Sequence, residues 1–134
     1  MGEKASLSPA ADGECPVLAT ARIVSGKWTL LVLRDLAGGP RRFSELERSL
    51  SGISPRTLSL RLRALEEAGI IERRAYNEVP PRVEYRLTGK GLDLVPIVDA
   101  MRTYGQQWLE ADECLPPAAP AAPVEQRRAL RARA

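Results

Sequence analysis

The stretch Ile53–Ile71, with the sequence ISPRTLSLRLRALEEAGII, is the part of the chain on which the fold is built. Ser54 can cap a helix with its hydroxyl, and Pro55 suits the first helical position because no N–H group is needed there. Gly69 is a favoured residue just past the end of a helix. The stretch therefore predicts a helix that begins after Ser54 and ends before Gly69.

The two faces of this helix carry different side chains. Leu58, Leu62 and Leu65 recur at i, i+4 and i+7, so they form one apolar stripe that faces a core. The opposite face carries Arg56, Leu60, Arg63 and Glu67, with Ser59 on its flank, and the first turn is small, hydroxylated and cationic, with Ser54, Arg56 and Thr57.

A first turn of this kind suits contact with DNA. Hydroxyls and main-chain N–H groups can hold phosphates, and an arginine can make two hydrogen bonds to the edge of a guanine. Leu60 can meet a thymine methyl group or pack against a neighbouring side chain. The helix alone leaves two interpretations open: a recognition helix whose N-terminus enters the major groove, or an ordinary amphipathic helix with a solvated basic face. In the first interpretation the candidate DNA contacts are Ser54, Pro55, Arg56, Thr57, Ser59, Leu60 and Arg63.

The segment before this helix predicts a second, shorter helix. Arg41–Phe43 is short and suits one edge strand. Ser44 is then expected to cap a small helix, Glu45–Leu50, whose two leucines face the core. Ser51–Gly52 follows as a turn. Two short helices joined by a tight glycine-containing turn form a helix-turn-helix pattern.

The segment after the helix predicts a hairpin. Ile70–Tyr76 and Val83–Leu87 are short, β-prone and partly alternating. The residues between them, 77–82, include two prolines, which cannot donate to a strand ladder, so they form the tip. We expect this tip, or wing, to project Arg82 and to be bordered by Arg74. A hairpin that directly follows a helix-turn-helix is the order of elements in a winged helix-turn-helix. The sequence therefore predicts this fold, which is α+β and mainly helical.

Two helices are predicted before the helix-turn-helix. The first begins at Cys15–Pro16, with Asp12 as a candidate cap, and its apolar face carries Val17, Leu18, Ala21 and Val24. The second, Lys27–Ala37, is more apolar than a surface helix needs to be. We therefore expect most of its large apolar side chains to be interior: Trp28, Leu31, Val32 and Leu36.

A long helix is predicted from Thr88 to about Glu110. Pro96 lies one to two turns inside it, which predicts a kink there or a short break before it. A spacing of 4-3-4-3, typical of a helix-packing seam, relates Leu94, Val98, Met101, Gly105 and Trp108. The apolar surface extends beyond this seam, and the surplus suits contact with another chain.

Composition narrows the function. The chain has 134 residues, a net charge of +3, no histidine and two cysteines. This length suits one domain, and a mild basic excess permits nucleic-acid binding without proving it. Without histidine, the usual general base and mixed zinc sites are missing, and no carboxylate pair or nucleophile stands out. We therefore expect that the protein is not an enzyme and that it binds no metal ion or cofactor. No apolar run approaches membrane-spanning length, and the N-terminus lacks the basic-then-apolar order of a signal peptide. We therefore expect a cytoplasmic protein that is not in a membrane.

The two ends differ in composition from the middle. We expect residues 1–14 to be a flexible arm, residues 15–110 to be the winged domain, and residues 111–134, rich in Pro, Ala and Arg, to be a disordered tail. The tail arginines suit a solubilising role or added electrostatic affinity for DNA: Arg127, Arg128, Arg131 and Arg133.

Six short motifs occur as one ordered series along the chain. They are Cys15-Pro16-Val17, Gly26-Lys27-Trp28-Thr29, GPRRFSEL at 39–46, GISPR at 52–56, LEEAG at 65–69 and VPPRVEY at 79–85. This series resembles the HxlR family of bacterial winged-helix transcriptional regulators over roughly residues 14–109. Each motif alone is weak, but the ordered series is highly specific.

The resemblance implies a homodimer that binds double-stranded operator DNA. The Ser54 helix would enter the major groove, and the wing at 77–82 would reach the flanking minor groove or backbone. Dimerisation in the family uses the N-terminal and C-terminal helices, which here implies Val17, Leu18, Leu94, Val98, Met101 and Trp108. In some relatives a cysteine near the position of Cys15 senses oxidants or electrophiles, so a redox or small-molecule effector is a candidate partner.

Two interpretations of Cys15 stay open. A thiol at the start of a helix lies at the positive end of the helix dipole, which favours the reactive thiolate. Asp12 and Glu14 lie beside it in sequence and disfavour negative charge there. Cys15 is then either a sensor or a small apolar residue that fills the dimer interface.

Other assignments also stay open. Trp28 suits a buried core position or the lining of a ligand pocket, and Tyr85 suits the core or a DNA contact from the wing. Arg41 and Arg42 suit phosphate contacts or a solvated edge. The main alternative function is a winged-helix protein-interaction module that docks the same helix on a partner protein without binding DNA directly.

Overall fold

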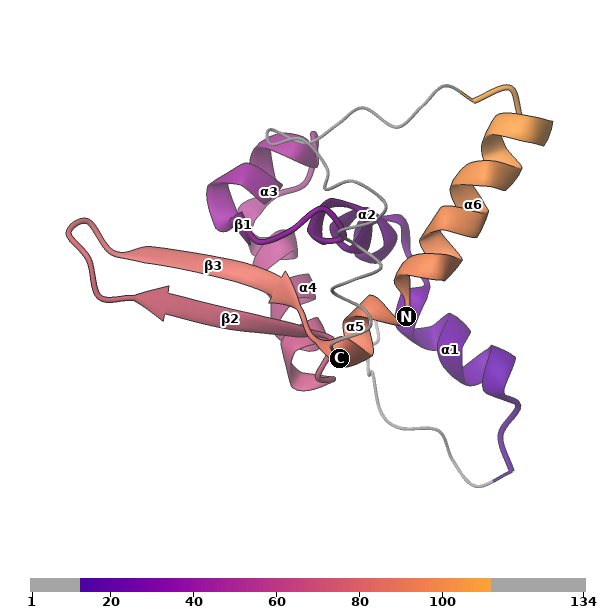
Figure 1. Ribbon diagram of the computed structural model, residues 1–134, viewed down its shortest axis with the longest axis horizontal. Helices are drawn as coiled ribbons and strands as arrows, with labels where there is room; N and C mark the ends of the chain where they lie inside the picture. The colour runs from indigo at the N-terminus through magenta and orange to yellow at the C-terminus, as the bar shows by residue number, and fades with distance from the viewer. Residues whose placement is uncertain (1–12, 112–134) are drawn as a thin grey trace.

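The computed structural model describes residues 13–111, which form a winged helix-turn-helix of the α+β class, as predicted (Figure 1). The elements in chain order are α1 (Pro16–Val24), α2 (Lys27–Leu36), β1 (Arg41–Arg42), α3 (Phe43–Ser49), α4 (Pro55–Glu67), β2 (Ile71–Tyr76), β3 (Arg82–Leu87), α5 (Gly89–Leu92) and α6 (Val95–Trp108).

The strands form one small antiparallel sheet in the order β1-β3-β2, so β1 lies at an edge, as predicted. β2 and β3 pair from Ile71 opposite Leu87 to Tyr76 opposite Arg82. This hairpin, residues 71–87, is called the wing below, and Figure 1 shows it extending away from the helices. Ile71 and Leu87 are buried, whereas residues 77–81 at the tip are exposed. The base of the wing is therefore part of the core, and its tip lies in solvent.

Helix α4 supplies one wall of the core through the predicted leucine stripe. Leu58, Leu62 and Leu65 are all buried. At the N-terminus of α4, the Ser54 hydroxyl accepts the Thr57 N–H at 3.0 Å, which is the predicted cap. At its C-terminus, Gly69 has a φ of +78°, a left-handed conformation that glycine adopts without strain.

Helix α2 differs in one respect from its prediction. Its buried stripe is Thr29, Val32, Leu33 and Leu36, again at i, i+3, i+4 and i+7. Trp28 and Leu31 lie on the flank of that stripe and are half-buried, although they pack against the core. They were expected to be mostly interior because the whole segment is apolar. A helix buries only the side that its neighbours cover, and hydrophobicity alone does not identify that side.

Helix α3 begins two residues earlier than predicted, and Ser44 is not its cap. Arg42 takes the N-cap position, and its N–H group is bonded by the Glu45 carboxylate at 2.8 Å. Glu45 therefore reaches back to the cap residue as in a capping box, and Ser44 lies inside the first turn. The two leucines of the predicted helix, Leu46 and Leu50, are buried as expected.

The predicted C-terminal helix is two helices with a short break before Pro96, which was one of the two expected outcomes. Thr88 caps α5 by accepting the Gly91 N–H at 3.1 Å. A Cβ on Gly91 would lie 2.1 Å from the carbonyl oxygen of Ile70, so this position requires glycine. α5 is thus packed directly on the start of β2. Helix α6 then starts at Val95 and ends at Trp108, two residues before the predicted end near Glu110.

Several predictions lie outside the described residues. They concern the arm before Gly13, the cap role of Asp12, Cys114, and the tail after Ala111. Within residues 13–111, no single helix is long and apolar enough to cross a membrane; α1 and α2 meet that criterion only as a pair bent by 83°.

The cap at Ser54 generates a stability prediction. Ser54→Ala removes the acceptor of the Thr57 N–H group and should lower the free energy of unfolding by about 1 kcal/mol, whereas Ser54→Asp keeps a good cap and should retain stability. Ser59→Ala, which removes an exposed hydroxyl from the interior of the same helix, is the matched control and should change stability by less than about 0.5 kcal/mol. Thermal unfolding measures all three variants. Equal melting temperatures for Ser54→Ala and wild type would contradict the cap.

Candidate nucleic-acid interface

The exposed face of α4 carries the residues that the sequence predicted there. Arg56, Ser59 and Arg63 are exposed, and 56% of the Leu60 surface is open to solvent. Among the ion pairs of residues 13–111, none includes Arg56 or Arg63. These two arginines are therefore charged groups without a carboxylate partner in the described part of the chain. They can meet an external anion without first breaking an ion pair.

The first turn of α4 offers fewer donors than the sequence suggested. Pro55 has no N–H, and the Thr57 N–H is already bonded by Ser54. The Ser54 hydroxyl in turn donates to Thr57 Oγ1 at 3.0 Å, so it is occupied in both roles. Two donors of this turn stay available within residues 13–111: the N–H of Arg56 and the hydroxyl of Thr57. Ser54 therefore shapes the turn rather than presenting its own hydroxyl.

The wing does not present Arg82 as an open cation. Its guanidinium carbon lies 4.0 Å from the centre of the Tyr76 ring. The same group pairs with Glu78 at 3.1 Å and with Glu84 at 3.9 Å, and 28% of the side chain is exposed. Arg74, the other predicted wing contact, is more exposed and pairs with Glu72 at 3.5 Å. The expectation of a projecting Arg82 was wrong because the folded hairpin brings Tyr76 of β2, Glu78 of the tip and Glu84 of the same strand around it.

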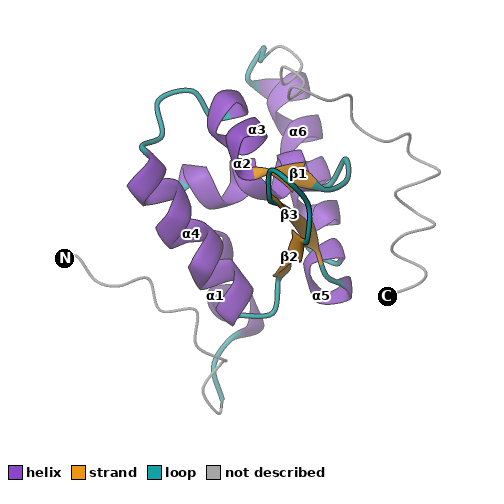
Figure 2. Ribbon diagram, turned by 90° about the vertical axis from the view of Figure 1, so that its left-hand side faces the viewer, coloured by secondary structure: helices purple, strands orange, loops and turns teal. Residues whose placement is uncertain are grey.

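Arg73 is a candidate that the sequence prediction omitted. It is exposed and takes part in none of the ion pairs found within residues 13–111. The signal was present in the alternation of the strand, which places Arg73 on the opposite face from Glu72 and Arg74. Figure 2, seen from the tip of the wing, shows the hairpin nearly end-on with α4 beside it, and β2 is in contact with α4.

The structure decides the open alternatives for Arg41 and Tyr85, whereas both interpretations of Arg42 stay open. Arg41 is 4% exposed and pairs across the sheet with Tyr85, so it is neither a phosphate contact nor a solvated edge residue. Arg42, its neighbour, is exposed. Tyr85 is half-buried and packs against the core, as alternation suggested. Trp28 also packs against the core, with Lys27 Nζ 4.6 Å from the centre of its ring.

A second exposed surface is apolar and lies on α1 and α6. Its large side chains are Val17, Leu18, Met101, Tyr104, Trp108 and Leu109, of which Val17 is 76% and Trp108 is 66% exposed. Val98 was assigned to this surface from its spacing but is 9% exposed and lies in the core of its own chain. Leu94 is half-buried against the same core. Both lie on the side of α6 that faces the domain, which spacing alone does not distinguish from the outer side.

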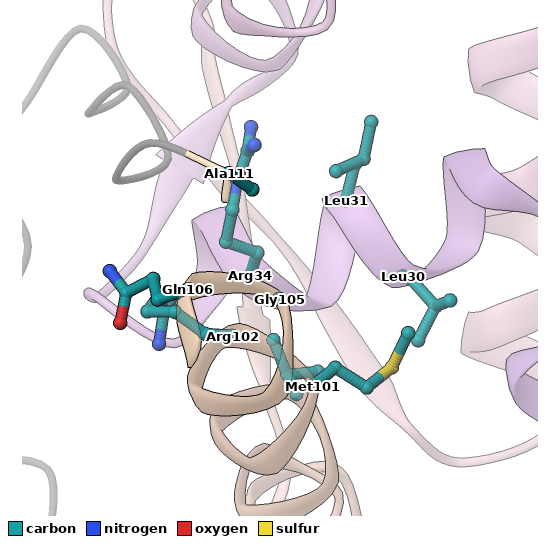
Figure 3. A pocket seen from close by; sticks show the side chains of 9 residues that line it. Leu30, Leu31, Arg34, Met101, Arg102, Gly105, Gln106 and Ala111 are labelled. Carbon is teal, nitrogen blue, oxygen red and sulfur yellow. The ribbon is translucent and has the colours of Figure 1, made fainter. Parts of the chain in front are cut away.

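Two apolar hollows open beside this surface. One, of about 200 Å³, lies between α2 and α6, where Met101 extends towards Leu30 (Figure 3). The other, of about 440 Å³, is lined by α1 and by Ile97 of α6. Trp28 lines neither of them. Within residues 13–111, no group of three or more metal-binding carboxylates or thiols was found.

Cys15 lies where the sequence placed it, at the N-cap of α1. Its thiol is free and exposed, and it makes no side-chain capping bond. It therefore lies beside the apolar surface of α1 and is accessible to small reagents in the single chain.

Comparison with known proteins agrees with this geometry. Residues 23–113 match the family model of the HxlR-like helix-turn-helix. An HTH-type transcriptional regulator of Synechocystis sp. is 47% identical over 100 residues, which cover 75% of this chain and 74% of that protein. YybR, an HTH-type transcriptional regulator of Bacillus subtilis, is 42% identical over 106 residues, covering 79% of this chain and 84% of that protein.

Solved structures show the same relationship. The redox regulator HypR in its reduced form has a TM-score of 0.67 and 41% identity, covering 69% of this chain and 92% of that one. The transcriptional regulator YodB of B. subtilis, in its reduced form, has a TM-score of 0.63 and 34% identity. The match covers 74% of this chain and 99% of that one. These relatives are transcriptional regulators and not enzymes. The chain therefore belongs to the HxlR-like helix-turn-helix family of transcriptional regulators.

Proposed function

We propose that this protein is a homodimeric transcriptional regulator that binds a specific operator in double-stranded DNA. The observation that carries the proposal is the exposed face of α4, where Arg56 and Arg63 have no carboxylate partner within residues 13–111. A helix that buries its leucine stripe and leaves unpaired arginines on the other side is suited to the major groove.

In this arrangement, different groups of the first turn of α4 contact the bases and the phosphates. The Arg56 guanidinium can make two hydrogen bonds to a guanine, while its N–H and the Thr57 hydroxyl reach a phosphate. Ser59 and Arg63 extend the contact along the groove, and Leu60 suits a thymine methyl group. Pro55 and Ser54 set the shape of the turn. Phosphate contacts position the helix on the duplex, and base contacts select the sequence.

The first prediction concerns Arg56. Arg56→Ala should weaken operator binding by about 1–3 kcal/mol and relax discrimination at one or two base pairs, since a bidentate base contact is lost. Lys27→Ala is the control, because Lys27 is an exposed cation at the start of α2 and belongs neither to α4 nor to the proposed dimerisation helices. Binding is measured on operator and generic duplexes at two salt concentrations, where phosphate contacts make affinity fall steeply with salt. If the wild-type protein bound no duplex even at low salt, the alternative of a protein-interaction module would replace this proposal.

The apolar surface on α1 and α6 supports the homodimer. Met101, Tyr104 and Trp108 follow one another at i, i+3 and i+7 on α6, and all three are exposed. Val17 and Leu18 add exposed apolar area on α1, and monomeric proteins rarely leave apolar patches of large size in water. A second copy that covers it would place two α4 helices at half-sites about one helical turn, ~34 Å, apart or a multiple of this distance.

The second prediction tests the dimer through Met101. Met101→Asp places a charge in the apolar seam, so it should convert the dimer to a monomer at micromolar concentration and weaken operator binding. Thr103→Asp adds the same charge on the opposite side of α6 and should remain dimeric. Sedimentation gives the mass of each variant. A Met101→Asp protein that sediments and binds DNA like wild type would contradict the proposed interface.

We also propose that oxidation or alkylation of Cys15 changes operator binding. HypR is described as a redox regulator, and YodB is known both reduced and diamide-treated. In this chain Cys15 is exposed and directly precedes α1, one of the two proposed dimerisation helices. Modification there would alter the packing of α1 and thereby the separation of the two α4 helices, without touching the face of α4 that meets DNA.

The third prediction follows from this position. Diamide or a thiol-reactive quinone should change operator binding by wild type and leave Cys15→Ser unaffected. Cys114→Ser controls for the second thiol and should respond like wild type. Operator titrations with and without each reagent measure the effect. The sensor role fails if wild type ignores both reagents, or if Cys15→Ser responds to the same extent.

A further inference from the structure

The pairing of the strands divides the charges of the wing between two faces. The outer face carries residues from all three strands: Arg42, Glu72, Arg74, Tyr76, Arg82, Glu84 and Arg86. Arg42 and Arg74 lie on either side of Glu84. Arg86 lies opposite Glu72, and a guanidinium nitrogen of Arg86 is 3.1 Å from a carboxylate oxygen of Glu72. The arginines of this face therefore alternate with carboxylates, and much of their charge is compensated locally.

Arg82 is the least available of the outer-face arginines. Its planar group stacks on Tyr76 and reaches both Glu78 and Glu84. If it turned towards a phosphate, it would leave two carboxylates next to that phosphate, and like charges at this distance repel each other. Its contacts join the first residue of β3 to the last of β2 and to the tip, which is the arrangement of a residue that stabilises the hairpin.

The inner face of the wing carries one exposed arginine within the described strands. Arg73 shares this face with Ile71 and lies directly opposite Tyr85. Ile71 is buried and Tyr85 packs against the core, so this is the face that turns towards the helices. Arg73 is exposed nevertheless, since β2 is an edge strand of the sheet whereas Tyr85 lies on the central strand β3, and it has no ion-pair partner in residues 13–111. β2 is the strand that packs against α4.

We propose that Arg73, and not Arg82, is the residue through which the wing holds DNA, by contact with a backbone phosphate beside the site that α4 reads. The proposal rests on the proposed function. The position of Arg73 favours contact with a backbone phosphate, since Arg73 lies midway along β2 and not at the tip, which is the part that would enter a groove. Such a contact fixes the register of α4 on the duplex and acts on all sequences alike.

The test separates DNA affinity from stability in the full-length protein. Arg73→Ala should weaken binding to operator and generic duplex by the same factor, about tenfold for two lost contacts per dimer, and should lower the log–log salt slope by about 1.8. Its melting temperature should equal that of wild type. Arg73→Lys keeps the charge and should retain the salt slope. Arg82→Ala should show the reverse: a lower melting temperature with an unchanged salt slope.

Arg74→Ala is the matched control, since it removes the neighbouring arginine from the outer face. It should change the salt slope less than Arg73→Ala does. The inference is overturned if Arg73→Ala binds both duplexes with wild-type affinity and slope, or if Arg82→Ala alone lowers the slope. Failure of the proposed function has a different signature, because wild type would then bind no duplex at any salt concentration.

Discussion

The burial of one side of α4 is the constraint on which the rest of the structure depends. Leu58, Leu62 and Leu65 are almost fully removed from water, and they orient the helix about its axis. Once this stripe is buried, Arg56 and Arg63 must point into solvent. The same burial that stabilises the domain thus presents the basic face, so the candidate interface requires no conformational change of its own.

The wing depends on the same core through its base. Ile71 and Leu87 are buried opposite each other, and this pair sets the register of the hairpin from its base to its tip. Because side chains alternate between faces, the register also decides which arginine meets a carboxylate and which does not. A shift by one residue would move Arg73 to the outer face and Ile71 into solvent. The hydrophobic cost of that exchange keeps the charge pattern of the wing in place.

Helix α6 shows how one element serves two surfaces. Val98 and Val95 face the core of the same chain, whereas Met101 and Trp108 are exposed. The break before Pro96 and the close approach of Gly91 to Ile70 determine the angle at which α6 leaves the domain. That angle decides which of its apolar residues stay uncovered. In the proposed dimer, the same angle would relate the apolar surface to the position of α4.

The sequence by itself determined the order of the elements, the cap at Ser54, the end at Gly69 and the leucine stripe, because each depends on residues within a turn or two of one another. It also placed Arg56 and Arg63 on the outside of α4, since helical periodicity links buried and exposed positions directly. Only the tertiary structure decided that Arg82 is surrounded by Tyr76, Glu78 and Glu84 while Arg73 is not, and that Val98 lies inside while Met101 lies outside. These outcomes depend on strand register and on which side of a helix its distant neighbours cover. The hairpin brings residues 76–84 together in a way that their alternation alone does not show, and the burial of Val98 depends on elements far from α6 in the chain.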